Sequence, residues 1–183
     1  MTSVDDRFDQ LVGRLQPTLT IVTTAVDGAR AGCVVGFHSQ CGIDPPRYAV
    51  WISKANYTYR IGVFAERFAV HFLRRDHLDH LELARRFATV SGDDVDKFAD
   101  GEWSAGPGGV PLLDPCPDRF VGRRLALLDA GPDHVCVVLE PVDVAGGGEF
   151  ATGNEGDEPG WLTVGALEGM TPGHEPDVRH PPT

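Results

Sequence analysis

The alternation of apolar and polar residues along the chain predicts a protein built mainly from short β-strands. Six segments rich in β-branched and aromatic residues are typical of strands: 18–26, 30–39, 48–53, 68–73, 120–128 and 134–144. The dipeptide Asp27-Gly28 favours positive φ and predicts a hairpin between the first two strands. We expect residues 161–167 to add one further strand.

Three segments have helical spacing instead. Residues 5–15 carry apolar side chains on one face and end before Pro17, a second helix follows Asn56, and a third covers about residues 77–88. Because these helices do not alternate regularly with the strands, a doubly wound parallel sheet is disfavoured, and no strand is followed by a G-x-G-x-x-G fingerprint. The pattern predicts a mainly β fold, an antiparallel barrel with two or three appended helices.

The remaining segments are predicted to be connections. Residues 91–109 are polar and glycine-rich and predict a long ordered loop, and residues 151–160 predict another loop. Four prolines after residue 168 predict a mobile C-terminal tail. With 183 residues and 42% hydrophobic composition, we expect one domain over residues 1–168 and a flexible tail over 169–183.

Charge narrows the classes of partner. The formal net charge is -11, which disfavours nucleic acid and anionic membranes as ligands. The stretch from Arg47 to Arg86 is nevertheless net basic and suits a small anionic ligand. No apolar run approaches the roughly 20 residues that cross a bilayer, and the acidic start does not resemble a signal peptide. We therefore expect a cytoplasmic protein with free thiols.

The stretch from Ala31 to Gly62 is the most informative. It contains Gly32, the step Asp44-Pro45-Pro46, a strand over residues 48–53, and Asn56-Tyr57-Thr58 before a helix. Further on follow FAVHFL, LARRFA, DKF, GVPLL and Asp133-His134. In this order the motifs resemble the flavin reductase-like family. The resemblance implies an FMN-binding split β-barrel of Greek-key type, usually a homodimer, with NAD(P)H as co-substrate.

The resemblance also implies which residues hold the FMN; FAD is the alternative flavin. They are Val35, Gly36, Phe37, His38, Ser39, Ser53, Lys54, Asn56, Thr58 and Arg86. The chain departs from the family where relatives often carry small hydroxyl residues, since it has Val34, Gly36 and Phe37 there. Backbone amides would supply some contacts instead, and Gly36 would allow close approach of a ring system.

Physical reasoning favours the same region for the phosphate of FMN. Lys54, Asn56 and Thr58 would supply a cation, an amide and a hydroxyl at the start of a predicted helix. Arg86 could add a bidentate donor pair. The alternative is that Asn56 is only a helix cap and Lys54 only solvated.

Two histidine features carry candidate chemistry. By the resemblance, His134 lies near the nicotinamide and would position and neutralise the nucleotide, because hydride passes directly between the two cofactors. The alternative is an exposed turn histidine. His77 and His80 have a spacing that can share a metal, but no third ligand is identifiable, so we expect a solvated helix face and no metal site.

These observations give one leading hypothesis and two alternatives. The first is an NAD(P)H-dependent flavin reductase, in one version the reductase partner of a two-component monooxygenase. The second is a non-enzymatic or weakly active flavin- or deazaflavin-binding protein, suggested by the missing hydroxyls. The third is a structural or regulatory barrel without cofactor.

Overall fold

A computed structural model describes residues 3–99, 101–129, 131–146 and 160–173. In chain order the elements are α1 (Val4–Val12), β1 (Thr20–Val26), β2 (Ala29–Val35), β3 (His38–Ile43), β4 (Pro46–Ser53), α2 (Tyr57–Gly62), β5 (Arg67–Phe72), α3 (Leu78–Thr89), β6 (Trp103–Ala105), the 3-10 helix η1 (Pro107–Gly109), β7 (Pro111–Leu113), β8 (Arg119–Leu128), β9 (His134–Ala145) and the 3-10 helix η2 (Val164–Leu167).

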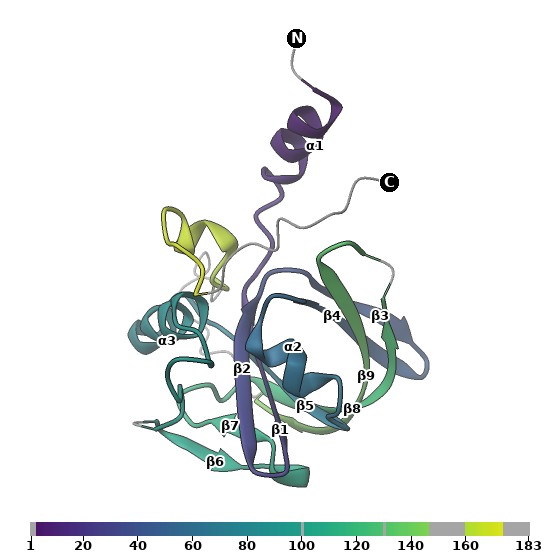
Figure 1. The fold of residues 1–183 in the computed structure, drawn as a ribbon, viewed down its shortest axis with the longest axis vertical. Coiled ribbons are helices and arrows are strands. Elements are labelled where there is room, and N and C mark those ends of the chain that lie inside the picture. Colours follow the sequence, from purple (N-terminus) through teal and green to yellow (C-terminus); the bar gives the residue numbers. More distant parts are fainter. Residues whose placement is uncertain (1–2, 100, 130, 147–159, 174–183) are drawn as a thin grey trace, which may run out of the picture.

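One antiparallel sheet forms the body of the molecule. Its strand order is β2-β1-β5-β8-β9-β4-β3, and the sheet curls round into a barrel with α2 across one opening (Figure 1). The edge strands β2 and β3 follow each other in the chain but are not hydrogen-bonded neighbours. The barrel is therefore split between them, and residues 36 and 37 connect its two edges. This confirms the predicted mainly β, antiparallel split barrel with appended helices.

The hairpin between β1 and β2 forms as predicted. Asp27 has φ 49° and Gly28 has φ 85°, the positive values that a two-residue primed turn requires. Val26 pairs with Ala29 immediately beside the turn, and the register continues to Thr20 opposite Val35.

The expectation of one continuous return strand over residues 30–39 was wrong. β2 ends at Val35 on β1, and β3 begins at His38 on β4. The chain crosses from one edge of the split barrel to the other at this point, and no single strand can pair with both edges. Apolar periodicity could not show the break, because both halves keep strand-like residues.

Two further expectations need correction. Within the predicted loop 91–109, Trp103–Ala105 form β6, which pairs with β7; strands of three residues are too short to show periodicity. Residues 161–167 do not form a strand. They make two isolated bridges, Thr18 to Thr163 and Arg74 to Trp161, and then turn into η2.

The start of the predicted tail is attached to the body. The amide of Gly173 donates a hydrogen bond to the carbonyl of Ala88 at 2.9 Å. Residues 174–183, the rest of that predicted tail, lie outside the described residues, as do residues 151–159 of the predicted loop.

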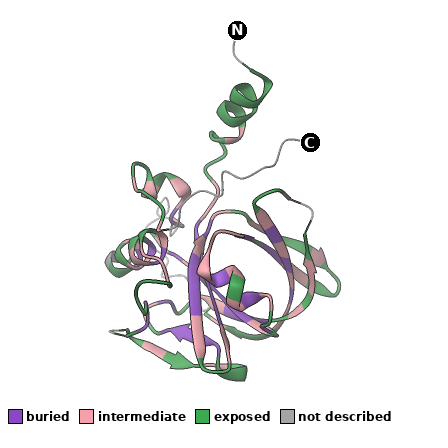
Figure 2. Cartoon of the chain, viewed as in Figure 1, coloured by how far each residue is buried: buried purple, intermediate pink, exposed green. Residues whose placement is uncertain are grey.

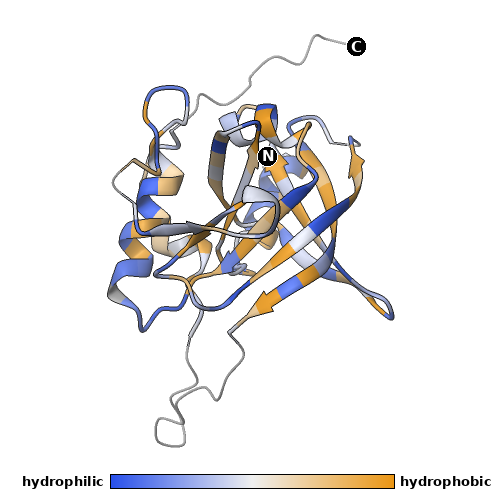
Figure 3. Ribbon diagram, turned by 90° about the horizontal axis from the view of Figure 1, so that it is seen from below, coloured by the Kyte–Doolittle hydropathy of each residue, from blue (hydrophilic) through white to orange (hydrophobic). Residues whose placement is uncertain are grey.

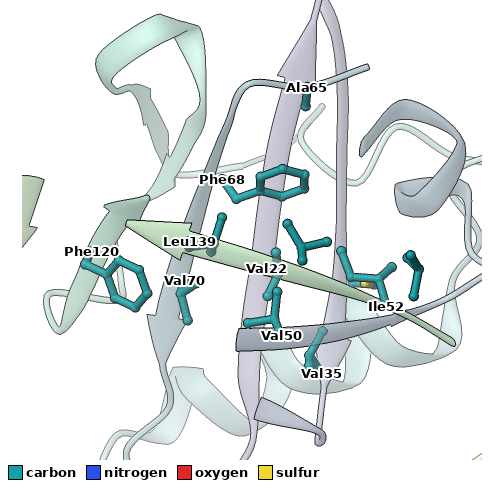
Figure 4. Packing of buried hydrophobic residues seen from close by; sticks show 12 residues of the cluster. Val22, Val35, Val50, Ile52, Ala65, Phe68, Val70, Phe120 and Leu139 are labelled. Carbon is teal, nitrogen blue, oxygen red and sulfur yellow. The ribbon is translucent and has the colours of Figure 1, made fainter. Parts of the chain in front are cut away.

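The barrel interior holds the main core, which Figure 4 shows from close by. Side chains from opposite walls meet there, among them Val22, Val50, Ile52, Phe68, Val70 and Leu139. A second cluster fills the space between the sheet and α3, including Ile21, Leu73, Phe87, Leu113 and Leu162. Figure 3 shows hydrophobic and hydrophilic positions mixed along the strands, and Figure 2 shows how burial is concentrated in the barrel.

Helix α1 stands away from the barrel (Figure 1). It has a capping box between Ser3 and Asp6 and no buried residue. Its apolar positions Val4, Phe8 and Leu11 are all exposed, by 81%, 61% and 64%. An isolated helix of this length gains little stability from propensity alone, so this apolar face is available for contact with another molecule.

Candidate functional site

The connection across the split barrel places an exposed aromatic ring at the surface. Val35, the last residue of β2, is buried in the core, whereas Phe37 is 59% exposed. The carbonyl of Phe37 accepts a hydrogen bond from the amide of Trp51 at 2.9 Å, which fixes the connection to β4. Gly36 lies between the buried and the exposed residue.

His38 begins β3 and is held inside a polar network. Its Nε2 donates to the carbonyl of Thr18 at 2.9 Å, so its Nδ1 accepts from the hydroxyl of Tyr48 at 2.6 Å. Burial lowers the pKa of His38, consistent with a neutral ring in this arrangement. Ser39, the next residue, is exposed and its hydroxyl donates to the carbonyl of Gln40 at 3.0 Å.

On the other side of Phe37, β4 ends beside the start of β9. Ser53 pairs with His134 in the register of these strands. The amide of Lys54 donates to the carbonyl of Asp133 at 2.8 Å. The Lys54 ammonium donates to the carbonyl of Gly131 at 3.0 Å and forms an ion pair with Asp129 at 2.6 Å. Lys54 therefore closes the loop that precedes β9.

His134 joins these residues to Phe37. Its ring lies edge-on to the Phe37 ring with centroids 5.4 Å apart. Its Nδ1 lies 3.0 Å from a carboxylate oxygen of Asp133, and its side chain is 28% exposed. The structure thus brings together Phe37, Ser53 and His134, and the backbone of Lys54 is bonded to the neighbouring Asp133.

The predicted phosphate ligands at the start of helix α2 differ from Lys54 in their surroundings. Asn56 occupies the N-cap position, but its side chain makes no capping hydrogen bond. Thr58 is only 1% exposed, and its side chain lies beside the thiol of Cys33 on β2. Burial raises the pKa of that thiol. The Thr58 side chain therefore faces the sheet, whereas Lys54 reaches the loop that precedes β9.

Arg86 lies in another part of the molecule. It lines a cavity of about 240 Å³ next to α3, together with Phe87, Phe98 and Trp103. None of the other predicted flavin ligands lines that cavity. Another cavity, of about 280 Å³, lies between the β1–β2 hairpin and residues 92–98. Neither of these two cavities includes Phe37, Lys54 or His134, so both are separate from the site at the split.

The expectation that the histidine pair at the start of α3 forms a solvated helix face was wrong for His80, which is buried. The rings of His77 and His80 stack with centroids 4.5 Å apart. His80 uses both nitrogens, since its Nδ1 accepts from the amide of Arg74 at 2.7 Å and its Nε2 donates to the carbonyl of Pro115 at 2.8 Å. Within the described residues, no group of three or more His, Cys, Asp or Glu side chains is placed to hold a metal ion. None of the described helices has the length and apolar character needed to span a membrane.

Several residues that shape the site gave no signal in the sequence. Tyr48 was counted only as a strand residue, yet its hydroxyl orients His38. Asp129 was assigned to a connection, yet it forms the ion pair with Lys54. Both contacts join residues from different elements, so only the fold could reveal them.

Comparison with known proteins identifies the family. The family model of the flavin reductase like domain matches residues 12–158, most of the chain. The chain therefore belongs to this family, as the sequence predicted, and is an oxidoreductase of the flavin reductase type.

Relatives with more specific names share much of the chain. The NADH-dependent FMN reductase SmoA of Agrobacterium fabrum (strain C58) is 32% identical over 140 residues, which are 75% of each protein. The structure of nitrilotriacetate monooxygenase component B (homologue) from Mycobacterium thermoresistibile has a TM-score of 0.69 and 20% identity, covering 97% of this chain and 96% of that one. The NADH:FAD oxidoreductase SgcE6 of Streptomyces globisporus C-1027 has a TM-score of 0.66 and 22% identity, with coverages of 78% and 83%. The two structures support the fold.

Proposed function

We propose that this flavin reductase binds FMN at the split of the barrel and transfers hydride to it from NADH. The observation that carries the proposal is the contact of the exposed Phe37 ring with the imidazole of His134 at the split, with the Lys54 ammonium held by the loop that precedes β9. The name of the FMN reductase that is 32% identical to the chain supports this choice of flavin and nucleotide.

The donor set at the split fits a flavin. Phe37 offers an exposed face on which a planar ring system can stack. Lys54 offers a cation for a phosphate, and Ser39 and Ser53 offer hydroxyls on β3 and β4. We propose that these residues, with the backbone of residues 35–38 and Asn56, hold FMN. Thr58 is buried and Arg86 lines the cavity beside α3. These two residues would contact the same FMN molecule only if the ligand reached past the split or the chain rearranged.

The chemistry at the site divides between cofactor and protein. FMN, when bound, supplies the ring that accepts hydride, and no protein acid is required for that transfer. The residues of this chain bind and orient the two nucleotides. We assign to His134 the contact with the pyridine nucleotide, because its ring lies against the exposed Phe37 and its side chain is partly exposed.

The alternative of a flavin- or deazaflavin-binding protein with little turnover has an observation in its favour. The Lys54 charge is already paired with Asp129, and the Thr58 hydroxyl is buried, so binding could be weak and unaccompanied by catalysis. Two measurements on the purified protein separate the hypotheses: quenching of FMN fluorescence on titration, and NADH oxidation with FMN, FAD and riboflavin. The proposal predicts both quenching and flavin-dependent oxidation, whereas quenching without oxidation would favour the alternative.

We also propose a homodimer that passes reduced flavin to a monooxygenase partner in the cytoplasm. The exposed apolar side chains support an association between copies: they include Phe8 and Leu11 on α1, and Trp51 and Leu128 on the sheet. The monooxygenase component among the structural relatives suggests the acceptor of reduced flavin. Light scattering at micromolar concentration should give twice the mass of one chain, 19.7 kDa, and a monomeric mass would contradict the dimer.

A further inference from the structure

A short segment beyond the family match crosses the end of the barrel; we call residues 160–167 the strap. The family model matches residues 12–158. The amide of Leu19 donates to the carbonyl of Leu162 at 2.7 Å, and the amide of Leu162 donates to the carbonyl of Leu73 at 2.8 Å. Leu162 itself is buried, with 5% exposure. The strap is therefore fixed between the start of β1 and the end of β5.

A second set of hydrogen bonds fixes the register of the strap. The side-chain carbonyl of Gln16 accepts from the amide of Gly165 at 3.2 Å and from the hydroxyl of Thr163 at 3.3 Å. The amide of Val164 donates to the carbonyl of Pro17 at 3.0 Å. Hydrogen bonds hold the amide of Val164 and both neighbouring residues, so Val164 has a defined position over the end of the barrel.

Val164 meets the connection across the split. A Cβ atom placed on Gly36 would lie 2.9 Å from Cγ1 of Val164 and 4.0 Å from Cδ2 of Leu19. Gly36 is not among the glycines with positive φ. Its lack of a side chain is therefore required by the space that Val164 fills and not by the backbone conformation.

The strap also reaches the other end of this connection. Thr163 forms an isolated bridge with Thr18, whose carbonyl accepts the hydrogen bond from His38. The strap therefore packs directly against residue 36 and reaches residue 38 through Thr18. Phe37 lies between them and contacts His134.

We propose that Val164 is a positioning residue of the flavin site, held in place by the hydrogen bonds of the strap. Val164 fills the space beside Gly36 and thereby fixes the turn that presents Phe37 to the ligand. This inference rests on the proposed function, because it assumes that FMN binds at Phe37. Val164 does not touch the reacting atoms and acts only through residues 36–38.

A double-mutant cycle on the full-length protein tests the proposal. Gly36→Ser introduces a side chain against Val164 and should raise the Kd for FMN roughly tenfold, because overpacking displaces the turn. Val164→Ala should raise the Kd for FMN a few fold by loosening the turn at residues 36–38. In the double variant the two effects should not multiply, since the smaller alanine side chain at position 164 leaves room for the serine, and binding should recover above that of Gly36→Ser alone.

Leu167→Ala is the matched control. Leu167 is also an apolar strap residue packed against the second core cluster. None of its atoms lies within 4 Å of a Cβ placed on Gly36. It should lower the melting temperature about as much as Val164→Ala while leaving the FMN Kd unchanged. FMN fluorescence quenching and thermal unfolding supply the two readouts.

Each outcome has a defined meaning. If Val164→Ala and Leu167→Ala change FMN affinity equally, or if the double variant binds as poorly as the product of the single effects predicts, the positioning role is wrong. If Gly36→Ser does not fold, the comparison of Val164→Ala with Leu167→Ala still decides. Failure of the wild-type protein to bind FMN would instead overturn the proposed function.

Discussion

Removing the positive charge of Lys54 should weaken binding of FMN more than binding of riboflavin, which lacks the phosphate. The ammonium group lies at the loop that precedes β9, 3.0 Å from the carbonyl of Gly131 and 2.6 Å from a carboxylate oxygen of Asp129. A phosphate that approached Lys54 would therefore compete with the carboxylate of Asp129 for the same cation. Lys54→Met is the suitable change, because it keeps most of the apolar stem.

The structure sets the expected size of this effect. A hydrogen bond to a charged group contributes about 1.5–3 kcal/mol. The Lys54 side chain is 23% exposed and Asp129 already balances part of its charge, so the lower end applies. About 1.5 kcal/mol corresponds to roughly a tenfold higher Kd for FMN. The Kd for riboflavin should change by less than about twofold.

Asp129 provides a control of opposite sign. Asp129→Asn removes the competing carboxylate but keeps the shape of the side chain. Because exposed ion pairs contribute at most about 1 kcal/mol, FMN affinity should rise by roughly two- to fivefold and riboflavin affinity should not change. The same variant in the Lys54→Met background should have no effect on FMN, since the cation is already absent.

Fluorescence titration with both flavins at low and moderate salt measures these changes. The difference between FMN and riboflavin should shrink as salt rises, because the interaction is electrostatic. Equal losses of FMN and riboflavin affinity in Lys54→Met, together with no gain in Asp129→Asn, would refute the assignment of the phosphate to Lys54.

Three further predictions concern histidines and a buried hydroxyl. His134→Ala should raise the KM for NADH roughly tenfold, which corresponds to about 1–2 kcal/mol of lost binding free energy, with little change in FMN affinity. An unchanged KM would assign His134 to an exposed turn. His71 donates to the carbonyl of Ile21 and accepts from the amide of Leu113, and burial lowers its pKa from 6.5 to about 3. Its contribution to the free energy of unfolding should be full above pH 6.5 and fall by about 1.4 kcal/mol per pH unit toward pH 3; urea unfolding of wild type and His71→Leu should show a flatter pH slope in the variant. Thr58→Val should lower the melting temperature and leave the FMN-to-riboflavin affinity ratio unchanged; a selective loss of FMN binding would place the hydroxyl at the phosphate.

The strand pattern was predictable from sequence where β-branched and aromatic residues are concentrated over six or more positions. β1, β5, β8 and β9 all match predicted segments within a few residues, and the Asp27-Gly28 turn forms as its residue types require. These features depend on local preference and on the hydrophobicity of the strands, which the sequence itself records.

The failures share a different cause. The break at Gly36 follows from the position of the split, and its glycine follows from contact with Val164, more than a hundred residues later in the chain. The inward orientation of Thr58 depends on how α2 lies against β2, where the thiol of Cys33 lies beside its side chain. Long-range packing of this kind leaves no period in the sequence.

The candidate site was recoverable only in part. Lys54, Ser53 and His134 were predicted from different motifs, and the pairing of β4 with β9 brings them together. Arg86 was grouped with them by charge, but it lines a cavity beside α3. Charge and residue type indicated which groups could bind a phosphate, and the fold decided which of them share a surface.

Anaerobic reduction of FMN by NADH in the presence of the purified protein tests the central claim most directly. We expect the visible absorbance of oxidised FMN to disappear at a rate proportional to protein concentration, and His134→Ala to slow this loss mainly at low NADH. Stable FMN absorbance in the presence of protein and NADH, with no quenching of FMN fluorescence on binding, would contradict the claim.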